Sequence, residues 1–293
     1  MTRLAGRPGR LLRDRVPMRY RSKLARTRVA IRRPTAAWRL LPSFIVIGAQ
    51  RAGTSSLYRY LSAHPGVRRP LRKEVDFFSV DHGRGTAWYR SHFPLRIPAC
   101  VTFEATPQYF VHPLAPARVR ELLPDVKLII AVRDPVDRAL SHYRLMRQIG
   151  VERLDLARAI DSERDRVRPD LDRLRADPAH RATDFLRFSY VMRSRYGEQL
   201  ARWREHFPAA SFHILDFDAF RTDPTVEWTA LLDFVGLEQW CPPDFTNWST
   251  QTNAGGAEDS GIRSRIAAAL GDDPCRFSEL SGRSFDWAQP PAG

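Results

Sequence analysis

Cysteine is scarce in this chain, which has three cysteines among 293 residues. Cys100, Cys241 and Cys275 are far apart and odd in number, so the sequence predicts neither a disulfide framework nor a cysteine-based metal cluster. We expect these cysteines to be small buried apolar residues.

Long apolar runs are also missing. No run approaches the roughly 20 residues that span a bilayer, and the N-terminus has no apolar region typical of a secretory signal. The default prediction is a cytoplasmic protein, with a membrane-peripheral location as an alternative. The 43% of hydrophobic residues is enough for a sizeable core.

Acidic residues are almost absent from the N-terminal end. Residues 1–43 contain 13 Lys or Arg and one acid, Asp14, so they account for +12 of the formal net charge of +14. We therefore interpret residues 1–42 as a basic, disordered arm and residues 43–290 as the folded domain. The alternative is an arm that makes weak contact with an anionic surface. No specific binding to nucleic acid is expected.

A lysine is missing where a phosphate-binding loop usually has one. The stretch Ser43–Tyr58 consists of an apolar run, a loop bounded by Gly48 and Gly53, and a helix start. The two glycines have the spacing of the Walker loop, but Thr54 occupies the Lys position and a cation, Arg51, lies inside the loop. This loop lacks a standard contact to the β- and γ-phosphates of a nucleotide. That argues against an ordinary ATPase or GTPase and favours a 5′-phosphosulfate.

The same loop predicts an anion site. Its amides and those of the first helical turn should converge on an anion, and the residue after the Lys position keeps a hydroxyl group. The expected ligand-binding residues of this stretch are Gln50, Arg51, Ala52, Gly53, Thr54 and Ser55.

Apolar runs alternate with helical patterns along the rest of the chain. Strands are predicted at residues 44–47, 101–104, 126–132 and 212–217. Such a series predicts an α/β fold with a mainly parallel sheet in one domain. The charge-dense stretch 150–186 is expected to be a solvent-facing helical insertion with breaks at Pro169 and Pro178.

A second segment, residues 72–79, places carboxylates beside Phe77 and Phe78. An acceptor hydroxyl that attacks sulfur must lose its proton, and a partly buried carboxylate is a suitable acceptor for it. Glu74 is the candidate base. Spacing alone favours the alternative, in which these charges pair with each other at the surface. Glu104, at the end of another predicted strand, is a second candidate for the electrostatics of the site.

A third segment follows the apolar run 126–132. Asp134 is expected to cap and Pro135 to begin a helix, so Arg133 lies where strand gives way to helix and Ser141 lies about two turns later. A guanidinium there can bind a second phosphate through two donors, with the serine hydroxyl as an extra donor. An ion pair with a nearby aspartate is an equally supported alternative.

Taken together, these segments resemble the sulfotransferases that use 3′-phosphoadenosine 5′-phosphosulfate (PAPS), particularly the branch with the heparan sulfate 3-O- and N-sulfotransferases. The resemblance extends over residues 43–287. It rests on the loop Gly48–Leu57, on Val132–Ser141 and on the Glu-x-x-Phe-Phe element of Lys73–Phe78, with further likeness at Glu104–Phe110, Arg195–Pro208 and Ser281–Trp287.

The resemblance implies a P-loop-like three-layer fold, with a central, mainly parallel sheet flanked by helices. It implies PAPS as the sulfuryl donor, released as its desulfo product PAP, and no metal requirement. Arg51 would contact the phosphosulfate and its bridging oxygen, while Arg133 and Ser141 would bind the 3′-phosphate. Glu74 would be the base, so Glu74 and Arg51 are the expected catalytic residues.

The chain departs from the glycan-modifying branch around the acceptor. Ala105 stands where relatives carry Lys, Asp76 and Ser79 stand in place of a His and an Asp, and Thr250–Gly256 lacks the lysine of a late basic loop. These changes point away from a heparan-like acceptor and leave the donor residues in place. The acceptor is expected to be a carbohydrate or another small molecule with a hydroxyl or, less often, an amine.

We therefore predict in-line sulfuryl transfer, with Glu74 as the base and the loop as the site that stabilises the leaving phosphate. One rival is a P-loop-type kinase that acts on a small molecule. A second is a nucleic-acid or membrane-surface binding protein built around the basic arm. Neither rival accounts for Arg133 and Ser141 after the apolar run 126–132.

Overall fold

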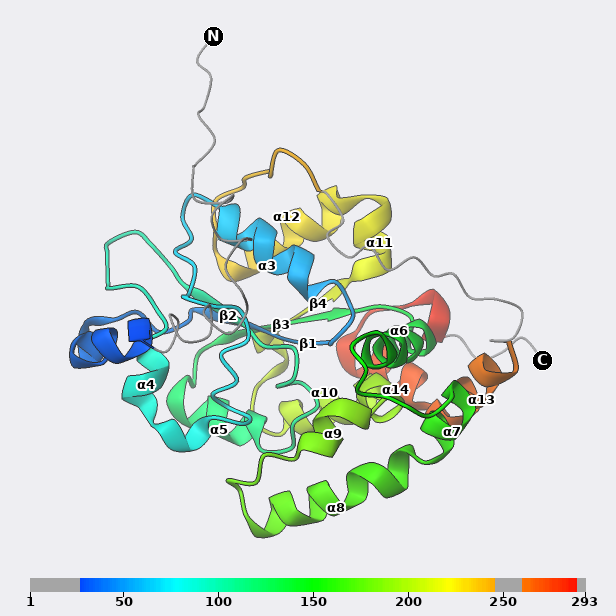
Figure 1. Cartoon of the computed structure of the whole chain (residues 1–293). Helices are drawn as coiled ribbons and strands as arrows, with labels where there is room; N and C mark the ends of the chain where they lie inside the picture. Colours follow the sequence, from blue (N-terminus) through cyan, green and yellow to red (C-terminus); the bar gives the residue numbers. More distant parts are fainter. Residues whose placement is uncertain (1–26, 246–259, 289–293) are drawn as a thin grey trace.

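The computed structural model describes residues 27–245 and 260–288 (Figure 1). In this part of the chain a sheet of parallel strands lies between layers of helices, in the order β2-β1-β3-β4. The strands are β1 (Phe44–Gly48), β2 (Phe103–Ala105), β3 (Lys127–Val132) and β4 (Phe212–Asp216). The predicted P-loop-like α/β fold with a central parallel sheet is confirmed.

Helices cover both faces of the sheet (Figure 1). One face carries α3 (Thr54–Ala63), α11 (Phe217–Thr222) and α12 (Pro224–Val235). The other carries α4 (Thr86–Arg90), α5 (Ala115–Leu122), α10 (Tyr196–Arg204) and α14 (Asp273–Ser281). The other α-helices are α6 (Pro135–Gln148), α7 (Leu156–Asp161), α8 (Glu163–Ala176), α9 (Thr183–Phe188) and α13 (Ser260–Leu270).

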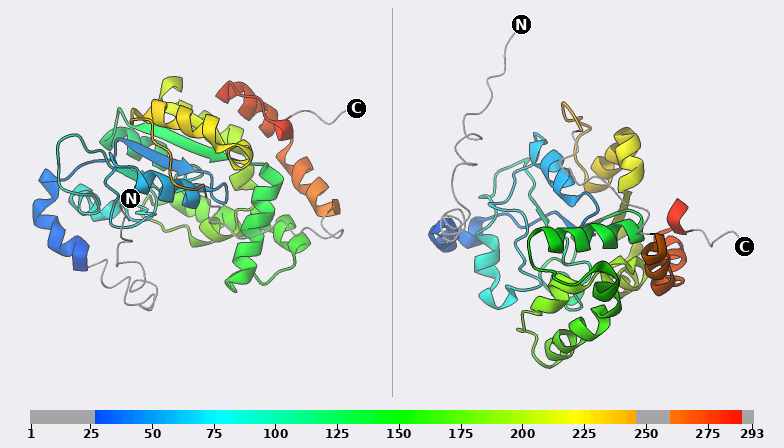
Figure 2. Two further views of the ribbon diagram at one scale, coloured as in Figure 1. Left: turned by 90° about the horizontal axis from the view of Figure 1, so that it is seen from above. Right: turned by 45° about the vertical axis from the view of Figure 1, so that its right-hand side comes forward.

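Short 3-10 helices complete the list of elements. They are η1 (Arg33–Trp38), η2 (His82–Arg84), η3 (Met192–Ser194), η4 (Ala209–Ser211) and η6 (Asp286–Ala288). The N-terminal described helix, in blue, and the pair α13 and α14, in orange to red, lie at opposite ends of the molecule (Figures 1 and 2).

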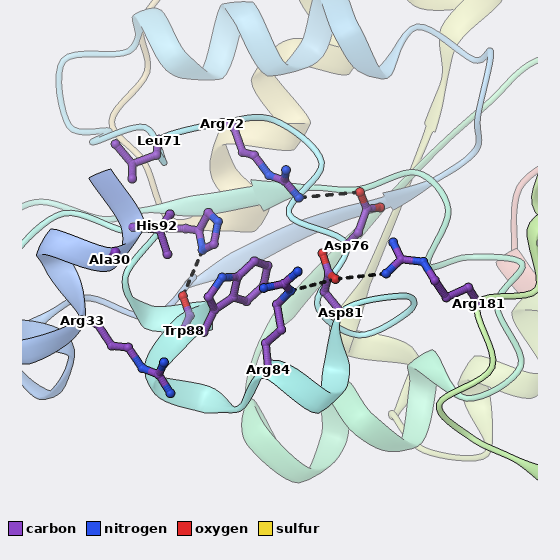
Figure 3. Close-up of a pocket in the computed structure, with 11 residues that line it drawn as sticks. Ala30, Arg33, Leu71, Arg72, Asp76, Asp81, Arg84, Trp88, His92 and Arg181 are labelled. Atoms are coloured by element: carbon purple, nitrogen blue, oxygen red, sulfur yellow. Dashed lines mark hydrogen bonds and ion pairs between the residues drawn. The ribbon is translucent and has the colours of Figure 1, made fainter. Parts of the chain in front are cut away.

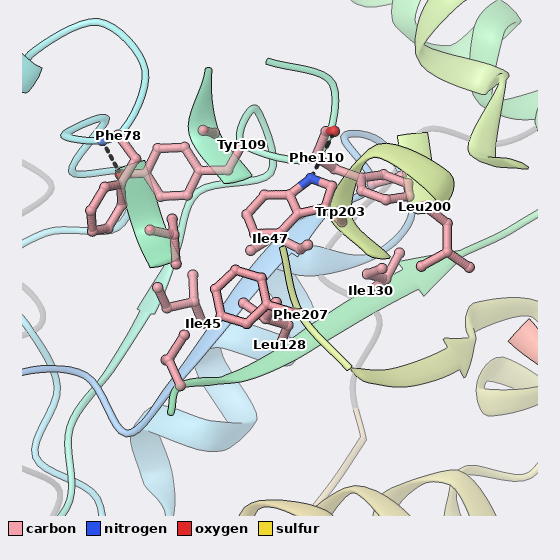
Figure 4. Close-up of a cluster of buried hydrophobic side chains, with 14 of the residues drawn as sticks. Ile45, Ile47, Phe78, Tyr109, Phe110, Leu128, Ile130, Leu200, Trp203 and Phe207 are labelled. Atoms are coloured by element: carbon pink, nitrogen blue, oxygen red, sulfur yellow. Dashed lines mark hydrogen bonds between the residues drawn. The ribbon is translucent and has the colours of Figure 1, made fainter. Parts of the chain in front are cut away.

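The core follows from the two-residue period of the strands. Phe44 and Val46 of β1 face α3 and α12, while Ile45 and Ile47 face α5 and α10. All four are fully buried, which is why the strand is a continuous apolar run. On the second face the indole of Trp203 donates a hydrogen bond to the Phe110 carbonyl at 3.1 Å, which links α10 to the loop after β2 (Figure 4).

Residues 27–42 differ from the expected disordered arm. Residues 27–32 are helical and continue into η1, which packs against α4. Val29 and Ala36 are buried, and the Arg39 guanidinium donates to the Phe93 carbonyl at 2.9 Å. The expectation is therefore wrong for this part of the arm, because its apolar side chains dock on the domain. Residues 1–26 lie outside the described part, and the boundary at residue 42 stays a prediction.

The insertion 150–186 is helical, as expected, but Pro169 is not a break. Helix α8 continues through it, and Val167 and Leu174 on its inner side pack with Phe185 of α9. The free energy gained from this packing offsets the cost of the one backbone hydrogen bond that a proline removes. Not every charge of the insertion faces solvent, since Glu163 is buried and accepts hydrogen bonds from the amides of residues 191 and 192.

The cysteines are free, but they are not the buried residues that we expected. Cys100 and Cys275 are half-buried and Cys241 is exposed. The late loop predicted around Thr250–Gly256 lies outside the described residues.

Candidate functional site

The loop between β1 and α3 is built by close approaches of its glycines. Gly53 has a φ of 78°, and a Cβ there would lie 1.9 Å from a ring carbon of Phe217. A Cβ on Gly48 would lie 2.5 Å from the Cβ of Phe110. The side chains of α11 and of the loop after β2 therefore press on the loop from two sides. Only glycine fits at either position.

The first turn of α3 continues this loop. Gly53 is the N-cap residue and supplies no side-chain cap. The first amides of a helix have no carbonyl partner within the helix, so those of Thr54 and Ser55 face outward at the positive end of the helix dipole. The Ala52 amide, in contrast, donates to the Ala49 carbonyl at 3.1 Å. Ala52 thus shapes the loop, while the start of α3 offers donors to an anion.

The structure brings the loop cation and the third predicted segment together. The Arg51 Nε donates to the Ser141 Oγ at 3.0 Å, from the loop to α6. Burial, and then the charge of Arg133, lower the pKa of Arg51 from its usual value. Two guanidinium groups and a hydroxyl therefore lie close together beside the phosphate-type loop.

Arg133 combines the two alternatives that the sequence left open, an ion pair with an aspartate and a donor that can bind a phosphate. Its Nη2 lies 3.2 Å from the Asp137 Oδ2, and its side chain is 11% exposed, so the pair is largely buried and not at the surface. Its Nε is buried and has no hydrogen-bond partner within the described residues. A buried donor without a partner is costly, so this nitrogen is available to an anionic ligand.

A third arginine, Arg138, supports the loop and the start of α6 from the interior of the protein. Arg138 is fully buried and donates to the Ser194 Oγ at 2.6 Å, to the Tyr190 carbonyl and, at 3.5 Å, to the Gln50 carbonyl. Burial lowers its pKa to about 10. Sequence reasoning gave Arg138 no role, although its place three residues before Ser141 on the same helix was a usable signal.

Glu74 lies in a strained turn. Glu74 and Asp76 have φ values of 59° and 62°, in the left-handed region that costs about 1–2 kcal/mol for such residues. The turn is held at the end of β2, because the Glu74 amide donates to the Ala105 carbonyl at 3.0 Å and the Val75 amide donates to the Thr106 Oγ1 at 3.2 Å. Strain that is retained in this way points to a functional segment.

Lys73 connects this turn to the loop. Its Nζ donates to the Ser55 Oγ and to the Glu74 Oε1, both at 2.9 Å. Sequence reasoning missed this lysine, although it precedes the candidate base directly. The Glu74 side chain is 52% exposed, so the expected burial beside Phe77 and Phe78 is not observed. The carboxylate is instead oriented by the neighbouring ammonium group.

Glu104 is a buried residue that positions the Glu74 turn. Its fully buried carboxylate accepts hydrogen bonds from Tyr89, Thr106 and Tyr109, at 2.5, 2.7 and 2.6 Å. Burial raises its pKa, and three hydroxyl donors satisfy its oxygens. Since Thr106 also binds the Val75 amide, Glu104 positions the Glu74 turn and does not face a substrate.

The predicted residues therefore form two hydrogen-bonded groups that meet at the loop between β1 and α3. Ser55 is joined to Glu74 through Lys73, and Arg51 is joined to Ser141. Within residues 27–245 and 260–288, no group of three or more His, Cys, Asp or Glu side chains is placed to hold a metal ion. The expected absence of a metal stays a prediction.

These features define an α/β protein with a P-loop-type anion site at the carboxyl edge of its sheet. The chain belongs to the sulfotransferase family, because residues 41–245 match the family model for the sulfotransferase domain. This confirms the resemblance that the sequence motifs indicated.

Individual relatives agree. The chain is 31% identical over 216 residues to human heparan sulfate glucosamine 3-O-sulfotransferase 5, covering 73% of this chain and 58% of that protein. It is 33% identical over 199 residues to mouse heparan sulfate glucosamine 3-O-sulfotransferase 3B1, covering 68% and 47%. The chain thus spans about half the length of these relatives. A sulfotransferase from Alicyclobacillus acidocaldarius superposes with a TM-score of 0.66 at 26% identity, covering 85% of this chain and 99% of that one.

The predicted cytoplasmic location is wrong by this comparison, since the heparan sulfate 3-O-sulfotransferases that the chain resembles are Golgi-lumenal enzymes. None of the helices in the described part of the chain is long and apolar enough to cross a bilayer.

Proposed function

We propose that this protein transfers a sulfuryl group from PAPS to a hydroxyl group of a carbohydrate. The observation that carries the proposal is the 3.0 Å hydrogen bond between Arg51 and Ser141, which joins the loop to the segment of Arg133. A ligand with phosphate groups at both ends of a nucleoside would be held by both parts at once. The relatives named as heparan sulfate sulfotransferases support a carbohydrate acceptor.

The residues present suit this donor. The start of α3 offers amides, Gly53 leaves no room for a side chain, and the buried Arg133 Nε has no partner among the described residues. When bound, PAPS supplies an SO₃ group whose bond to the 5′-phosphate breaks as the bond to the acceptor oxygen forms. The electron pair of the broken bond stays on the phosphate.

The chain provides a proton acceptor and a set of charges. The Glu74 carboxylate takes the proton of the acceptor hydroxyl as the new oxygen–sulfur bond forms. Arg51, Lys73 and the amides of Thr54 and Ser55 stabilise the negative charge that collects on the leaving phosphate. Arg133 and Ser141 select a nucleotide with a 3′-phosphate. Most of the rate enhancement then comes from positioning and fixed electrostatics.

The rival functions are not favoured. A kinase of the P-loop type needs a lysine where this chain has Thr54, and the match to the sulfotransferase family leaves that rival without support. A protein built only to bind nucleic acid or membrane would have no use for the arrangement around Arg51. Weak contact of the basic arm with anionic surfaces stays compatible with the enzyme.

Donor binding can be measured directly by titration calorimetry. PAP should bind at least about tenfold more tightly than AMP, because only PAP carries the 3′-phosphate. Arg133→Ala should weaken PAP binding by about 10- to 100-fold, equivalent to about 1.5–3 kcal/mol for a charge-assisted hydrogen bond, and should leave AMP binding within about threefold. Equal affinity for PAP, AMP and ATP would contradict the donor assignment.

The role of Glu74 is tested by Glu74→Gln, which keeps the size of the side chain and removes its basicity. Turnover with PAPS and an acceptor pool should fall by about 10²- to 10⁴-fold, while PAP affinity stays within about threefold. Glu198→Gln, at an exposed helical position far along the chain, is the matched control. Near-normal turnover of Glu74→Gln would remove this residue as the base.

A further inference from the structure

Residues 190–196, which we call the linking segment, connect α9 to α10 and include η3. Two buried hydroxyl groups of this segment hold the backbone around Arg133. The Ser194 hydroxyl donates to the Pro135 carbonyl at 2.6 Å, and the Tyr196 hydroxyl donates to the Arg133 carbonyl at 3.3 Å. The linking segment therefore fixes the start of α6, where Arg133 is placed to bind a phosphate.

Arg138 connects the linking segment to the loop between β1 and α3. Its guanidinium donates to the Ser194 hydroxyl at 2.6 Å and to the Tyr190 carbonyl, and a longer hydrogen bond of 3.5 Å reaches the Gln50 carbonyl. The next residue, Arg51, has a φ of 75°, a strained value that surrounding contacts must hold. A trans peptide directs its N–H opposite to its C=O, so the Arg51 amide points away from Arg138. The conformation of the loop thus depends on where Arg138 is held.

Glu163, the first residue of α8, holds the linking segment in turn. Its carboxylate is buried and accepts hydrogen bonds from two consecutive amides, those of Val191 at 2.7 Å and Met192 at 2.8 Å. These amides lie at the start of η3, where backbone donors have no partner within the helix. Because α8 belongs to the insertion 150–186, the insertion is joined through Glu163 to the segment that supports both parts of the donor site.

The charge of Glu163 can change near neutral pH. Burial raises the pKa of this carboxyl group to about 7, against the opposing effect of the two amides and of Arg138. The other charged groups around it are Arg193 and the four that line a cavity of about 460 Å³ beside it, Asp161, Arg164, Arg195 and Glu198. An ionised carboxylate accepts stronger hydrogen bonds than a protonated one. Glu163 should therefore hold the linking segment most firmly above pH 7.

Asp170, on the same helix, offers a matched comparison. Its carboxylate is also buried and also accepts hydrogen bonds from two consecutive amides, those of Asp184 at 2.6 Å and Phe185 at 3.1 Å. These amides belong to the first turn of α9 and not to the linking segment. The two carboxylates thus do the same local work at two different places.

A second comparison comes from the other end of the insertion. Arg181 lies 3.7 Å from Asp81, in the wall of a cavity of about 640 Å³ that is lined by residues of the segment 71–76, of η2 and of α4 (Figure 3). This ion pair attaches the insertion to η2 and not to the linking segment.

We propose that Glu163 is a positioning residue for sulfuryl transfer, because its carboxylate fixes the linking segment and thereby the loop between β1 and α3 and the Arg133 region. The connection runs through Ser194 and Arg138. This inference rests on the proposed function, since it concerns the binding of the same donor. Helix α8 then contributes to donor affinity from outside the donor site.

The test is titration calorimetry of PAP with the full chain, as wild type and as Glu163→Gln, at pH 6 and pH 8.5. Glutamine keeps the size of the side chain but replaces one acceptor oxygen by an NH₂ group. At pH 8.5 the variant should bind PAP about three- to tenfold more weakly than the wild type. At pH 6, where Glu163 is protonated, the difference should shrink to at most about twofold. The titration of PAP itself cancels in this ratio.

Asp170→Asn is the matched control, since it removes the same kind of capping group from the same helix. It should leave PAP affinity within about twofold of the wild type at both pH values, and so should Arg181→Gln. Urea unfolding shows whether each variant is folded. If Glu163→Gln does not fold, Ser194→Ala takes its place, because it removes a single hydroxyl from the same connection, and it should weaken PAP binding by about three- to tenfold.

Three results would overturn the inference while leaving the donor assignment intact. They are equal PAP affinity of wild type and Glu163→Gln (or Ser194→Ala) at pH 8.5, a ratio for Glu163→Gln that does not change with pH, and an equal loss of affinity in Asp170→Asn. Absence of PAP binding by the wild type is a different failure, because it contradicts the donor assignment and the inference together.

Discussion

Single residues of this site act through charges that they share. Lys73 donates hydrogen bonds to the Ser55 hydroxyl and to the Glu74 carboxylate. The Asp137 carboxylate forms ion pairs with both Arg133 and Arg263. Such sharing orients each side chain more strictly than one contact would. Asp76 differs from these residues, because its ion pair with Arg72 is long, at 3.9 Å, and the charges of three carboxylates, Glu74, Glu104 and Asp81, oppose its ionisation.

The pKa of Asp76 is raised from its usual 3.8 to about 7 by burial and by the charges of Glu74, Glu104 and Asp81, against the opposing effect of Arg72. Between about pH 4 and pH 7 the native protein therefore holds a proton that the unfolded chain has lost. The free energy of unfolding should fall as the pH rises through this window.

Asp76→Asn should abolish the contribution of this carboxyl group to the decrease in the free energy of unfolding. Relative to the variant, the wild-type protein should lose about 2 kcal/mol between pH 4.5 and pH 7.5, a value discounted because the side chain is 30% exposed. Urea unfolding of both proteins at the two pH values measures the difference, and other titrating groups such as Glu163 cancel in the comparison. A difference that does not change with pH would contradict the shift.

At the scale of elements, the loop between β1 and α3 packs closely against α11, with Gly53 in contact with the ring of Phe217. Gly53 and Gly236 offer a matched comparison, because both have a φ of 78° but only Gly53 is pressed by another side chain. A Cβ on Gly236 would meet only the end of Lys127, at 3.7 Å.

Gly236→Ala should cost about 1 kcal/mol of stability, from the left-handed backbone alone. Gly53→Ala should cost at least about 2 kcal/mol more, since Phe217 must move, and it should weaken PAP binding by at least about tenfold. Chemical denaturation and PAP titration of the two variants test this. Equal costs at the two glycines would show that the contact with Phe217 is unimportant.

Elements with a strong local pattern were predictable from sequence. Residues 44–47 and 126–132 are apolar because both faces of their strands are covered, and Asp134 with Pro135 begins α6 as expected, the Asp134 carboxylate accepting the Asp137 amide. The Lys73 contact to Ser55 could not be predicted, because it joins residues on different elements that only the folded sheet brings together.

Burial was harder to predict than helix or strand. The sequence suggested a buried Glu74, yet the turn is left-handed at that residue and directs the carboxylate to solvent and Lys73. It also suggested an unstructured arm up to residue 42, because charge dominates its composition, whereas a few apolar residues such as Val29 and Ala36 suffice to dock the last part.

At the scale of the whole molecule, the positive charge is concentrated in the N-terminal part of the sequence. Of the net charge of +14, residues 1–43 contribute +12, and within the described part of that stretch η1 packs against α4. The remainder is nearly neutral. The long-range attraction of the protein for polyanions should therefore be a property of its N-terminal end.

Binding to duplex DNA should accordingly be weak and nonspecific. Two unrelated 20-base-pair duplexes should bind equally, and the affinity should fall at least about tenfold between 50 and 200 mM salt. Replacing Arg3, Arg7 and Arg10 by Gln should reduce the salt dependence, whereas replacing the exposed Arg164 by Gln should not. Fluorescence anisotropy measures both, and a clear preference for one duplex would contradict this prediction.

The bridge formed by Lys73 has a consequence for how mutations combine. One ammonium group serves both the donor loop and the base, so loss of either partner changes the charge that the other experiences. The free-energy effects of replacing Ser55 and Glu74 are therefore not independent, and their sum will differ from the effect of the double replacement. In this protein the two halves of the site form a single thermodynamic unit.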